Sequence, residues 1–288
     1  MKRECPEKSE YLTVYADLHL HTTASDGELT PSEVVSRAHL RGLEAIAITD
    51  HDTLSGLPEA IVFGEENPVS VIAGIEISAA YEPGTMHILG YFPEYPGGME
   101  ERLSFIQEAR RKRCPRIIKR LNDLGMPVTV DEVMTVSGKN QIGRPHIAKA
   151  LVNKGIVKNF DQAFSRYLAK GKPAYVEKER MTVEESVALI REFGGLVVLA
   201  HPFTLELEAH RLRLLIKNLK LLGLNGIEIL YPEHTRAQKK LYTTIAHDLG
   251  LLITGGTDYH GPGRNNIRIG DFGITKPAYE NILENFNT

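Results

Sequence analysis

The chain has 288 residues, with 34 lysines and arginines against 37 aspartates and glutamates, a net charge of −3, and 42% hydrophobic residues. This composition is globular, and it excludes a disordered chain and one that coats nucleic acid by bulk charge. The length fits about two domains or a single α/β barrel. Only Cys5 and Cys114 occur, which argues against a disulfide scaffold and favours a reducing compartment.

Targeting signals are not evident. Residues 1–10 are polar and lack the apolar core of a signal peptide. No apolar run approaches the ~20 residues that a membrane-spanning helix needs. We therefore expect a cytoplasmic protein that does not act on membranes.

Seven short runs rich in β-branched residues recur along the chain, most of them followed by a polar cluster. Nearly continuous apolar runs are typical of strands buried on both faces of a parallel sheet. The predicted strands are Val14–Leu18, Ala45–Thr49, Val69–Ile77, His87–Tyr91, Leu196–Ala200, Gly226–Leu230 and Leu251–Thr254.

Amphipathic stretches between many of these strands predict helices. The predicted helices are Pro31–Leu40, Thr182–Phe193, His210–Leu222 and Ala237–Leu249. Thr30 and Thr182 are each followed three residues later by glutamate, the pattern of a capping box. Strands alternating with helices indicate an α/β fold, either a barrel or a doubly wound sheet.

One segment, from Met99 to about Lys172, interrupts this alternation and contains helices without a good strand. Glu100–Leu124 predicts a long charged helix that Pro115 could kink. Shorter helices are predicted at Pro127–Val136, Arg144–Lys154 and Asn159–Lys170. We interpret residues 99–172 as a helical insertion, with residues 13–98 and 173–288 as the two parts of a barrel.

The first predicted strand ends in a pair of histidines, His19 and His21. Residues two apart on a strand point to the same face, so the two imidazoles can meet at one point. A shared metal ion is the commonest reason for such a pair, although packing alone could also explain it. Asp26 follows five residues later in a turn sequence.

Histidines and acidic residues also follow most of the other predicted strands. In parallel α/β folds the carboxyl ends of the strands form the rim where sites assemble, so one metal site would explain the whole set. By contrast, His39, His210 and His247 lie in predicted helices, where we expect solvated or packing roles. The candidate metal ligands are His19, His21, Asp26, His51, Glu76, His87, His201, Asp258 and His260.

The chemistry of this set restricts the metal. Imidazoles and carboxylates without cysteine exclude thiolate zinc sites and iron–sulfur clusters. Six imidazoles and three carboxylates exceed what one tetrahedral ion can use, so we expect two or three divalent ions, manganese first, with iron or zinc as alternatives. Clustered divalent ions activate hydroxide and hold phosphoryl oxygens, which favours hydrolysis of phosphate esters.

The motifs at the strand ends resemble those of the PHP (polymerase and histidinol phosphatase) superfamily and occur in the same order. They cover most of the chain outside the helical segment. The matching stretches are Asp17–Thr22, Thr49–Asp52, Gly74–Ser78, His87 before Ile-Leu-Gly-Tyr, Ala200–Pro202 and Gly256–His260. The resemblance implies a distorted seven-stranded (β/α) barrel with a site for three metal ions.

The resemblance also implies how the ligands are divided among the ions. One ion would bind His19, His21, Glu76 and Asp258. A second would share Glu76 and add His87 and His201, and a third would bind Asp26, His51 and His260. Asp17 and Asp50 would not bind a metal themselves but would orient the imidazoles that do. The alternative is that they cap strand ends or turns.

The helical segment resembles a subgroup of this superfamily that removes the 3′-phosphate of nucleoside 3′,5′-bisphosphates and includes members that degrade short RNA from its 5′ end. The similarity lies in Gly143–His146 and in Tyr231–Thr235. Arg144 suits a phosphate because its planar guanidinium binds two oxygens. His146 and His234 are candidates for substrate binding and for the unidentified general acid. For all three residues an ordinary structural role is the alternative.

A basic run on the long predicted helix could steer a polyanionic substrate, but we prefer a charged, solvated helix face because three glutamates lie just upstream. The run consists of Arg110, Arg111, Lys112, Arg113, Arg116, Lys119 and Arg120.

The sequence therefore predicts a metal-dependent phosphoesterase that attacks nucleotide phosphate esters with a metal-bridging hydroxide. We expect a small nucleotide as its substrate, with short RNA as a second substrate, and no obligate protein partner. The alternatives are histidinol phosphatase or another small phosphomonoesterase with the same metal set, an amidohydrolase, and a non-catalytic metal-binding module.

Overall fold

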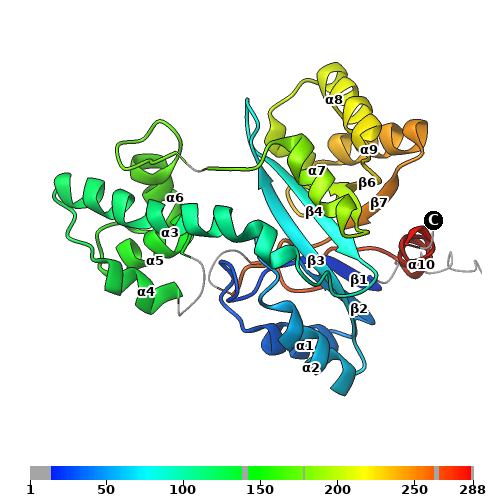
Figure 1. Cartoon of the computed structure of the whole chain (residues 1–288), viewed down its shortest axis with the longest axis horizontal. Helices are drawn as coiled ribbons and strands as arrows, with labels where there is room; N and C mark the ends of the chain where they lie inside the picture. Colours follow the sequence, from blue (N-terminus) through cyan, green and yellow to red (C-terminus); the bar gives the residue numbers. More distant parts are fainter. Residues whose placement is uncertain (1–13, 138–141, 178, 263–265, 287–288) are drawn as a thin grey trace, which may run out of the picture.

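The computed structural model describes residues 14–137, 142–177, 179–262 and 266–286 (Figure 1). Its centre is a single seven-stranded sheet, and each strand lies at a predicted position. The strands are β1 (Ala16–Leu20), β2 (Ala45–Ile48), β3 (Ser70–Ala79), β4 (Met86–Phe92), β5 (Leu196–Leu199), β6 (Gly226–Leu230) and β7 (Leu252–Gly255).

The strands are hydrogen-bonded in chain order, and the sheet curls into a nearly closed barrel. A bridge between Leu20 and Tyr259, which follows β7, brings the two edges together. The barrel alternative of the sequence analysis is thus confirmed. The expected parallel order needs one correction, because β4 runs antiparallel to both β3 and β5. Its partner β3 is joined to it by a short connection, which suits a hairpin and leaves no room for a crossover helix.

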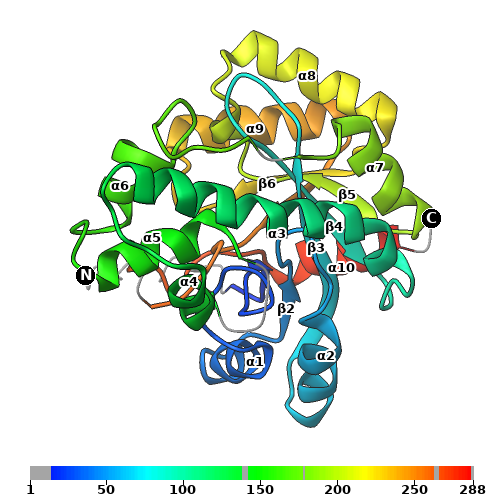
Figure 2. The same cartoon turned by 60° about the vertical axis from the view of Figure 1, so that its left-hand side comes forward.

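Both faces of the sheet are buried, which explains the continuous apolar runs. On β2, Ala45 and Ala47 belong to one hydrophobic cluster, and Ile46 and Ile48 belong to another. Alternate residues of a strand point to opposite faces, so neither face of β2 can be polar. Helices cover the sheet from outside (Figures 1 and 2). They are α1 (Pro31–Leu40), α2 (Leu57–Glu66), α7 (Val183–Glu192), α8 (Ala209–Leu222), α9 (Arg236–Leu249) and α10 (Lys276–Asn285).

Capping side chains fix where several of these helices begin. Thr30 and Thr182 both form the predicted capping boxes, in which the threonine hydroxyl accepts from the third backbone N–H and the glutamate accepts in return. Thr235 caps α9 in the same way with Gln238. Each box satisfies two backbone donors that would otherwise lack a partner.

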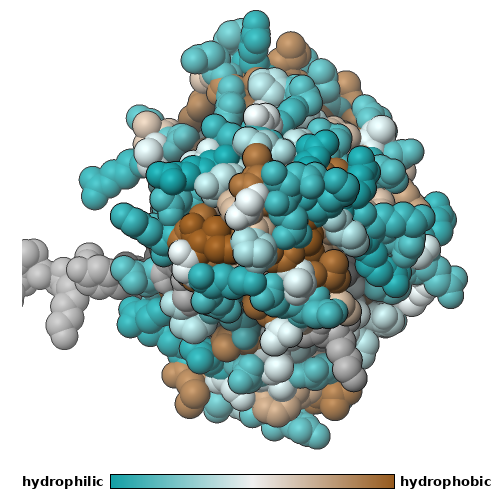
Figure 3. All heavy atoms as spheres, turned by 90° about the vertical axis from the view of Figure 1, so that its left-hand side faces the viewer, coloured by the Kyte–Doolittle hydropathy of each residue, from teal (hydrophilic) through white to brown (hydrophobic). Residues whose placement is uncertain are grey.

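The helical segment lies beside the barrel and faces its rim (Figures 1 and 2). Its helix α3 runs from Met99 to Asp123 and continues through Pro115. The rest is α4 (Val130–Ser137), α5 (Arg144–Asn153), the short α6 (Phe160–Ala163) and a π-helical turn (Phe164–Leu168). Figure 3 shows that the outer face of this segment is largely hydrophilic, with hydrophobic residues gathered across its middle.

The helical segment has a hydrophobic cluster of its own, and α3 joins this cluster to the barrel. Leu103 and Ile106 in the first half of α3 pack into the main core. Ile117 and Leu121 in the second half pack into the separate cluster, together with Leu151 of α5. The packing therefore divides within α3, and the division of the chain into domains stays a prediction.

None of the helices in the described ranges has a stretch that is both long and apolar enough to cross a membrane.

Candidate metal centre

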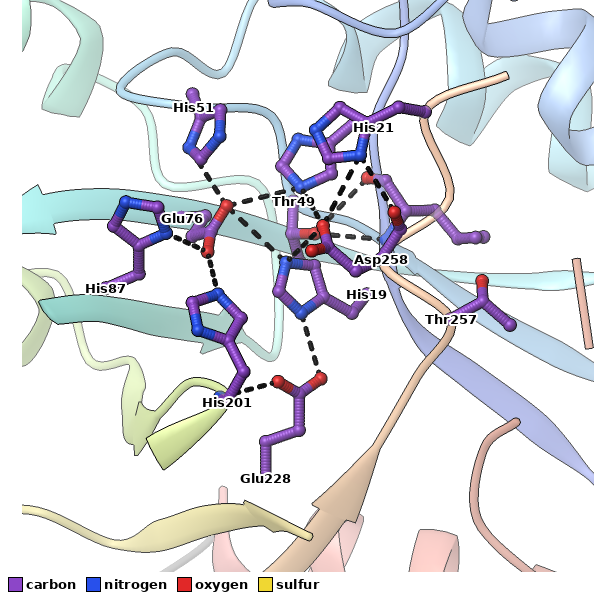
Figure 4. Close-up of polar contacts among 12 residues, drawn as sticks. His19, His21, Thr49, His51, Glu76, His87, His201, Glu228, Thr257 and Asp258 are labelled. Carbon is purple, nitrogen blue, oxygen red and sulfur yellow. Dashed lines mark hydrogen bonds and ion pairs between the residues drawn. The ribbon is translucent and has the colours of Figure 1, made fainter. Parts of the chain in front are cut away.

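Six strands of the barrel bring the candidate ligands to one rim (Figure 4). His19 lies on β1 and His21 follows it, while His51, His201 and Asp258 follow β2, β5 and β7. His87 stands near the start of its strand, yet it reaches the same rim because β4 runs antiparallel to its neighbours. The reversal of β4 thus places a residue from a strand beginning among residues from strand ends.

The carboxylate of Glu76 is the centre of this rim (Figure 4). Its Oε1 lies 2.7 Å from Nδ1 of His87 and 3.0 Å from Nε2 of His201. Its Oε2 lies 2.9 Å from Nδ1 of His51, 3.2 Å from Nε2 of His21 and 3.4 Å from Nε2 of His19. One carboxylate therefore faces five imidazoles, the arrangement expected of a group that bridges cations.

A second carboxylate and a peripheral pair complete the cluster. Oδ1 of Asp258 lies 3.1 Å from Nε2 of His21 and 3.4 Å from Nε2 of His19. Nε2 of His260 lies 3.2 Å from Oδ1 of Asp26. Ligand atoms within 4.8 Å of one another form three groups, namely His19–His21–Glu76–Asp258, His51–Glu76–His87 and His21–Asp26–His51–His260.

One structural observation indicates that these residues could hold divalent metal ions. Several buried polar atoms at the rim lack a hydrogen-bond partner although they face one another, among them Nε2 of His19, Nε2 of His21, Nδ1 of His51, Oε2 of Glu76 and Oδ1 of Asp258. Leaving so many buried polar atoms unsatisfied is costly unless a further group binds them. Nitrogen and carboxylate donors without thiolate suit manganese, iron or zinc.

The electrostatics of the rim reflect its crowded charges. Burial alone would lower the pKa of His19, but the carboxylates of Glu228, Asp258 and Glu76 raise it well above its usual value. Burial likewise opposes a rise for His21, yet its contacts with Asp258 and Glu76 raise its pKa to about 10. Burial lowers the pKa of His87 to about 4 despite its contact with Glu76.

Backbone strain accompanies two of the candidate ligands. His201 has φ of 23° and Asp258 has φ of 50°, in the left-handed region that residues other than glycine rarely adopt. Each such residue costs on the order of 1–3 kcal/mol and persists only where the surroundings impose it. This backbone conformation directs both side chains toward the rim, where the other candidate ligands lie.

Glu228 holds two of the candidate ligands in place. It was not among the residues predicted from the sequence. Its carboxylate accepts from Nδ1 of His19 at 2.9 Å and from the backbone N–H of His201 at 2.8 Å. The side chain of Glu228 is fully buried. The signal was available, because a lone acidic residue in the apolar run Gly226–Leu230 must have a buried partner.

Asp17 and Asp50 hydrogen-bond to loops, and their role in orienting imidazoles stays a prediction. Asp17 accepts from the hydroxyl of Thr257 at 2.6 Å and from the backbone N–H of Gly270 at 2.9 Å. Asp50 accepts from the hydroxyls of Thr22 at 2.7 Å and Ser25 at 2.5 Å. Each carboxylate thus contacts a loop on which candidate ligands lie.

His146 and His234 both hydrogen-bond to nearby backbone groups, and their parts in substrate binding and acid catalysis stay predictions. Nδ1 of His146 accepts from the backbone N–H of Gly143 at 3.0 Å and so caps α5. Nδ1 of His234 donates to the carbonyl of Ile229 at 2.9 Å. Its ring is buried against Phe203, Tyr231 and Tyr242. Neither histidine lines the cavities described next.

Arg144 lies in a cavity that also reaches the rim, and its part in phosphate binding stays a prediction. We call this the inner cavity; Asp26, His51 and His87 line its rim side, and Arg113 and Arg144 line its helical side. Arg144 donates to the carbonyl of Leu168 at 3.1 Å. Both guanidinium groups lie over the ring of Tyr175, at 5.5 Å for Arg113 and 5.6 Å for Arg144.

Other described members of the basic run, namely Arg111, Lys112 and Lys119, do not line this cavity, and the side chain of Arg110 lies outside the described part. Arg111 and Lys112 form ion pairs with Glu108, and Lys119 forms one with Asp123 on the same helix. These exposed pairs are the solvated helix face that was the simpler interpretation of the run. Arg113 differs from them because it is buried and donates to the carbonyl of Val176 at 2.8 Å.

A nearly closed α/β barrel with imidazoles and carboxylates gathered at one rim is typical of hydrolases that bind several divalent ions. Within that class, residues 17–218 match the PHP domain, and the chain belongs to the PHP domain family. Its similarity to phosphoester-cleaving members over most of its length makes it a hydrolase of phosphoester bonds.

Relatives at nearly equal identity act on different phosphoesters. A 5′-3′ exoribonuclease of Haemophilus influenzae is 34% identical over 252 residues, 87% of this chain and 92% of the relative. A 3′,5′-nucleoside bisphosphate phosphatase of Chromobacterium violaceum is 33% identical over 88% of this chain and 90% of its own. A phosphoribosyl 1,2-cyclic phosphate 1,2-diphosphodiesterase of Eggerthella lenta is also 33% identical, over 85% and 94%.

A solved structure shares the whole architecture. It is a protein of Chromobacterium violaceum described as an amidohydrolase with bound sulfate, and it superposes with a TM-score of 0.86 at 31% identity. The superposition covers 94% of this chain and 96% of that one, so it includes the helical segment as well as the barrel.

Proposed function

We propose that this phosphoesterase removes the 3′-phosphate of nucleoside 3′,5′-bisphosphates and also cleaves short RNA from its 5′ end. The observation that carries the proposal is the inner cavity, which has candidate metal ligands at one end and two arginines, Arg113 and Arg144, at the other. A molecule with phosphates at both ends of a nucleoside has the charge distribution that such a cavity accommodates.

The candidate ligands would hold two or three divalent ions, for which we propose manganese. His19, His21, Glu76 and Asp258 would bind one ion, and Asp26, His51 and His260 would bind another. Glu76 and His87 would bind the remaining ion, with His201 contacting the same oxygen of Glu76 as His87 does. Bound divalent ions polarise phosphoryl oxygens and lower the pKa of water, which is the chemistry that ester hydrolysis needs.

For two of the imidazoles, the chain favours one nitrogen at the rim. Glu228 accepts from Nδ1 of His19, which leaves the lone pair of Nε2 toward Glu76 and Asp258. The hydroxyl of Thr204 lies 3.2 Å from Nδ1 of His201 and likewise leaves its Nε2 toward Glu76. Such partners orient ligands and raise their basicity.

The arginines would position the substrate. A guanidinium beside a phosphate forms short charge-assisted hydrogen bonds and fixes the direction in which the rest of the molecule points. With its 5′-phosphate near Arg113 and Arg144, a bisphosphate would present its 3′-phosphate at the rim. Positioning of this kind supplies a large part of the rate acceleration in phosphoryl transfer.

A panel of phosphoesters tests the proposal. Protein loaded with manganese should turn over adenosine 3′,5′-bisphosphate with a kcat/KM at least tenfold above those for histidinol phosphate, an aryl phosphate and a phosphoribosyl 1,2-cyclic phosphate. A preference for histidinol phosphate or the cyclic ester would contradict the proposed substrate. Absence of turnover with every ester would contradict catalysis itself and favour a metal-binding module.

A further inference from the structure

A second cavity opens on the other side of the metal rim, and the proposed function does not use it. We call it the aromatic cavity. It is lined by Phe160, Phe164 and Tyr231, and it reaches the rim at Asp258 and His260. Its volume of about 370 Å³ is in the range of small-molecule sites, roughly 300–1,000 Å³. The rim therefore lies between two cavities, with Asp26, His51 and His87 facing one and Asp258 and His260 facing the other.

The two cavities also border on the same part of the helical segment. Pro145 and Phe164 of the helical segment line both of them. A bisphosphate with its 5′-phosphate at Arg144 and its 3′-phosphate at the rim would not reach the residues of the aromatic cavity beyond Asp258 and His260. A longer RNA bound in the same way would have more nucleotides beyond the scissile phosphate, and the aromatic cavity lies on that far side of the rim.

A third pocket lies next to the aromatic cavity, and we call it the arginine pocket. It has a volume of about 340 Å³ and is lined by Arg37, Arg41 and Arg268 among others. Ile267 lines both this pocket and the aromatic cavity. The loop after β7 connects the pocket to the rim as well, because Tyr259, between Asp258 and His260, lines the arginine pocket.

The charges along this route alternate in a way that suits a polynucleotide. Asp161 and Glu233 line the aromatic cavity, where carboxylates disfavour phosphate but accept hydrogen bonds from ribose hydroxyls, and aromatic rings stack on bases. The arginine pocket carries three guanidinium groups against the carboxylate of Asp271, which pairs with Arg41 and Arg268. It is therefore positively charged and suits a backbone phosphate.

We propose that the part of an RNA substrate beyond the scissile phosphate runs through the aromatic cavity into the arginine pocket. This inference rests on the proposed function, since it assumes that the 5′ nucleotide occupies the inner cavity. It explains how one rim could serve both a mononucleotide and an RNA, with the arginine pocket used by RNA alone.

The test compares substrates of different length in the double variant Arg37→Gln/Arg268→Gln. Arg268 has 69% of its side chain exposed, and Arg37 is exposed on α1, so the fold should survive their loss. We expect kcat/KM for a 5′-phosphorylated RNA of four to six nucleotides to fall roughly tenfold, as for a lost charge-assisted contact. The value for adenosine 3′,5′-bisphosphate should stay within about twofold of wild type, because that substrate does not reach the pocket.

A matched control removes an arginine elsewhere. Arg213 on α8 pairs with Asp248 at 2.8 Å, so Arg213→Gln also breaks an exposed ion pair and changes the net charge equally per residue. This variant should leave both substrates unaffected. A second readout is the affinity of metal-free protein for fluorescent RNA, measured by anisotropy at several salt concentrations. The double variant should bind more weakly and lose about 0.7 of the salt slope per phosphate contact.

The outcomes separate this inference from the proposed function. Equal RNA turnover in wild type and double variant would overturn the inference, and so would turnover of the bisphosphate without any cleavage of RNA by wild type; both leave the proposed function standing. An equal loss on the bisphosphate and on RNA would also overturn it, because the arginines would then support the rim through Tyr259. Failure of wild type on every nucleotide substrate would remove the proposed function and this inference together.

Discussion

Glu228 accepts a hydrogen bond from Nδ1 of His19 at 2.9 Å, and both side chains are completely buried. The contact determines where the proton of His19 resides and therefore which nitrogen is available at the rim. Glu228 on β6 thus orients the imidazole of His19 on β1, although these two strands are not neighbours in the sheet.

We expect Glu228→Gln to weaken metal binding by about 10- to 100-fold, the usual effect of removing a partner that orients a ligand. The amide can donate to His19 and so favour the wrong tautomer. Competition with a coloured chelator would measure the affinity for Mn²⁺. Glu192→Gln is the control, because Glu192 is exposed and pairs with Arg102 far from the rim. Unchanged affinity in Glu228→Gln would show that the contact does not tune the site.

His201→Ala and Asp258→Ala should each lower turnover at least ~100-fold, since losing a ligand should cost more than losing the partner of a ligand. Both residues lie at the barrel rim, and the hydrophobic clusters do not include them. Circular dichroism should therefore stay close to that of wild type. Near-wild-type rates in either variant would remove that residue from the proposed site.

Arg144→Ala should lower kcat/KM for a 3′,5′-bisphosphate by roughly 10- to 150-fold, because a charge-assisted contact contributes about 1.5–3 kcal/mol. A simple aryl phosphate has its only phosphate at the rim and should be little affected. The ratio of the two losses is the measurement. Similar losses on both substrates would instead mean that Arg144 supports the rim through its contact with Leu168.

Protein purified gently with manganese supplied should contain two to three equivalents of metal by elemental analysis. A chelator should abolish activity and lower the melting temperature. The reason is mass action, which stabilises the native state by about 2.7 kcal/mol when the metal is at 100 times its dissociation constant. Added Mn²⁺ should restore both. Activity that persists at a metal content near zero would contradict a metal-dependent mechanism.

Cys114 should react slowly with thiol reagents, although it lines the inner cavity. Burial raises the pKa of its thiol to about 11. At pH 8 the thiolate is then about a thousandth of the population, and the rate should rise about tenfold for each unit of pH until the pKa is reached. Ellman's reagent on a Cys5→Ser background would measure this. A fast reaction at pH 7 would contradict the raised pKa.

The seven strands could be predicted because strands buried on both faces give continuous apolar runs, as Ile46 and Ala47 on β2 illustrate. Strand direction could not be read from those runs, since an apolar stretch has no direction. The short connection between Ala79 and Met86 did contain that information, because a parallel crossover needs a dozen or more residues.

The candidate ligands could be predicted because their types and positions at strand ends are unusual for surface residues. Their supports were harder to assign. Asp17 and Asp50 contact backbone or hydroxyl groups of distant loops, and such contacts leave no local pattern. Arg113 belongs to a charged run of the sequence. Only the orientation of α3 shows that its side chain, unlike those of Arg111 and Lys112, faces the inner cavity.

Tyr91 of β4 pairs with Leu196 of β5, although the whole helical segment and α7 lie between them in the chain. Bringing such distant strands together carries a loop-closure entropy cost, and contacts between distant residues slow folding. The separate hydrophobic cluster of the helical segment can form from nearer neighbours, and α3 then anchors it to the first strands. During synthesis, we expect the helices to assemble before β5 exists, so that pairing of β5 with β4 is a late step that organises the active rim.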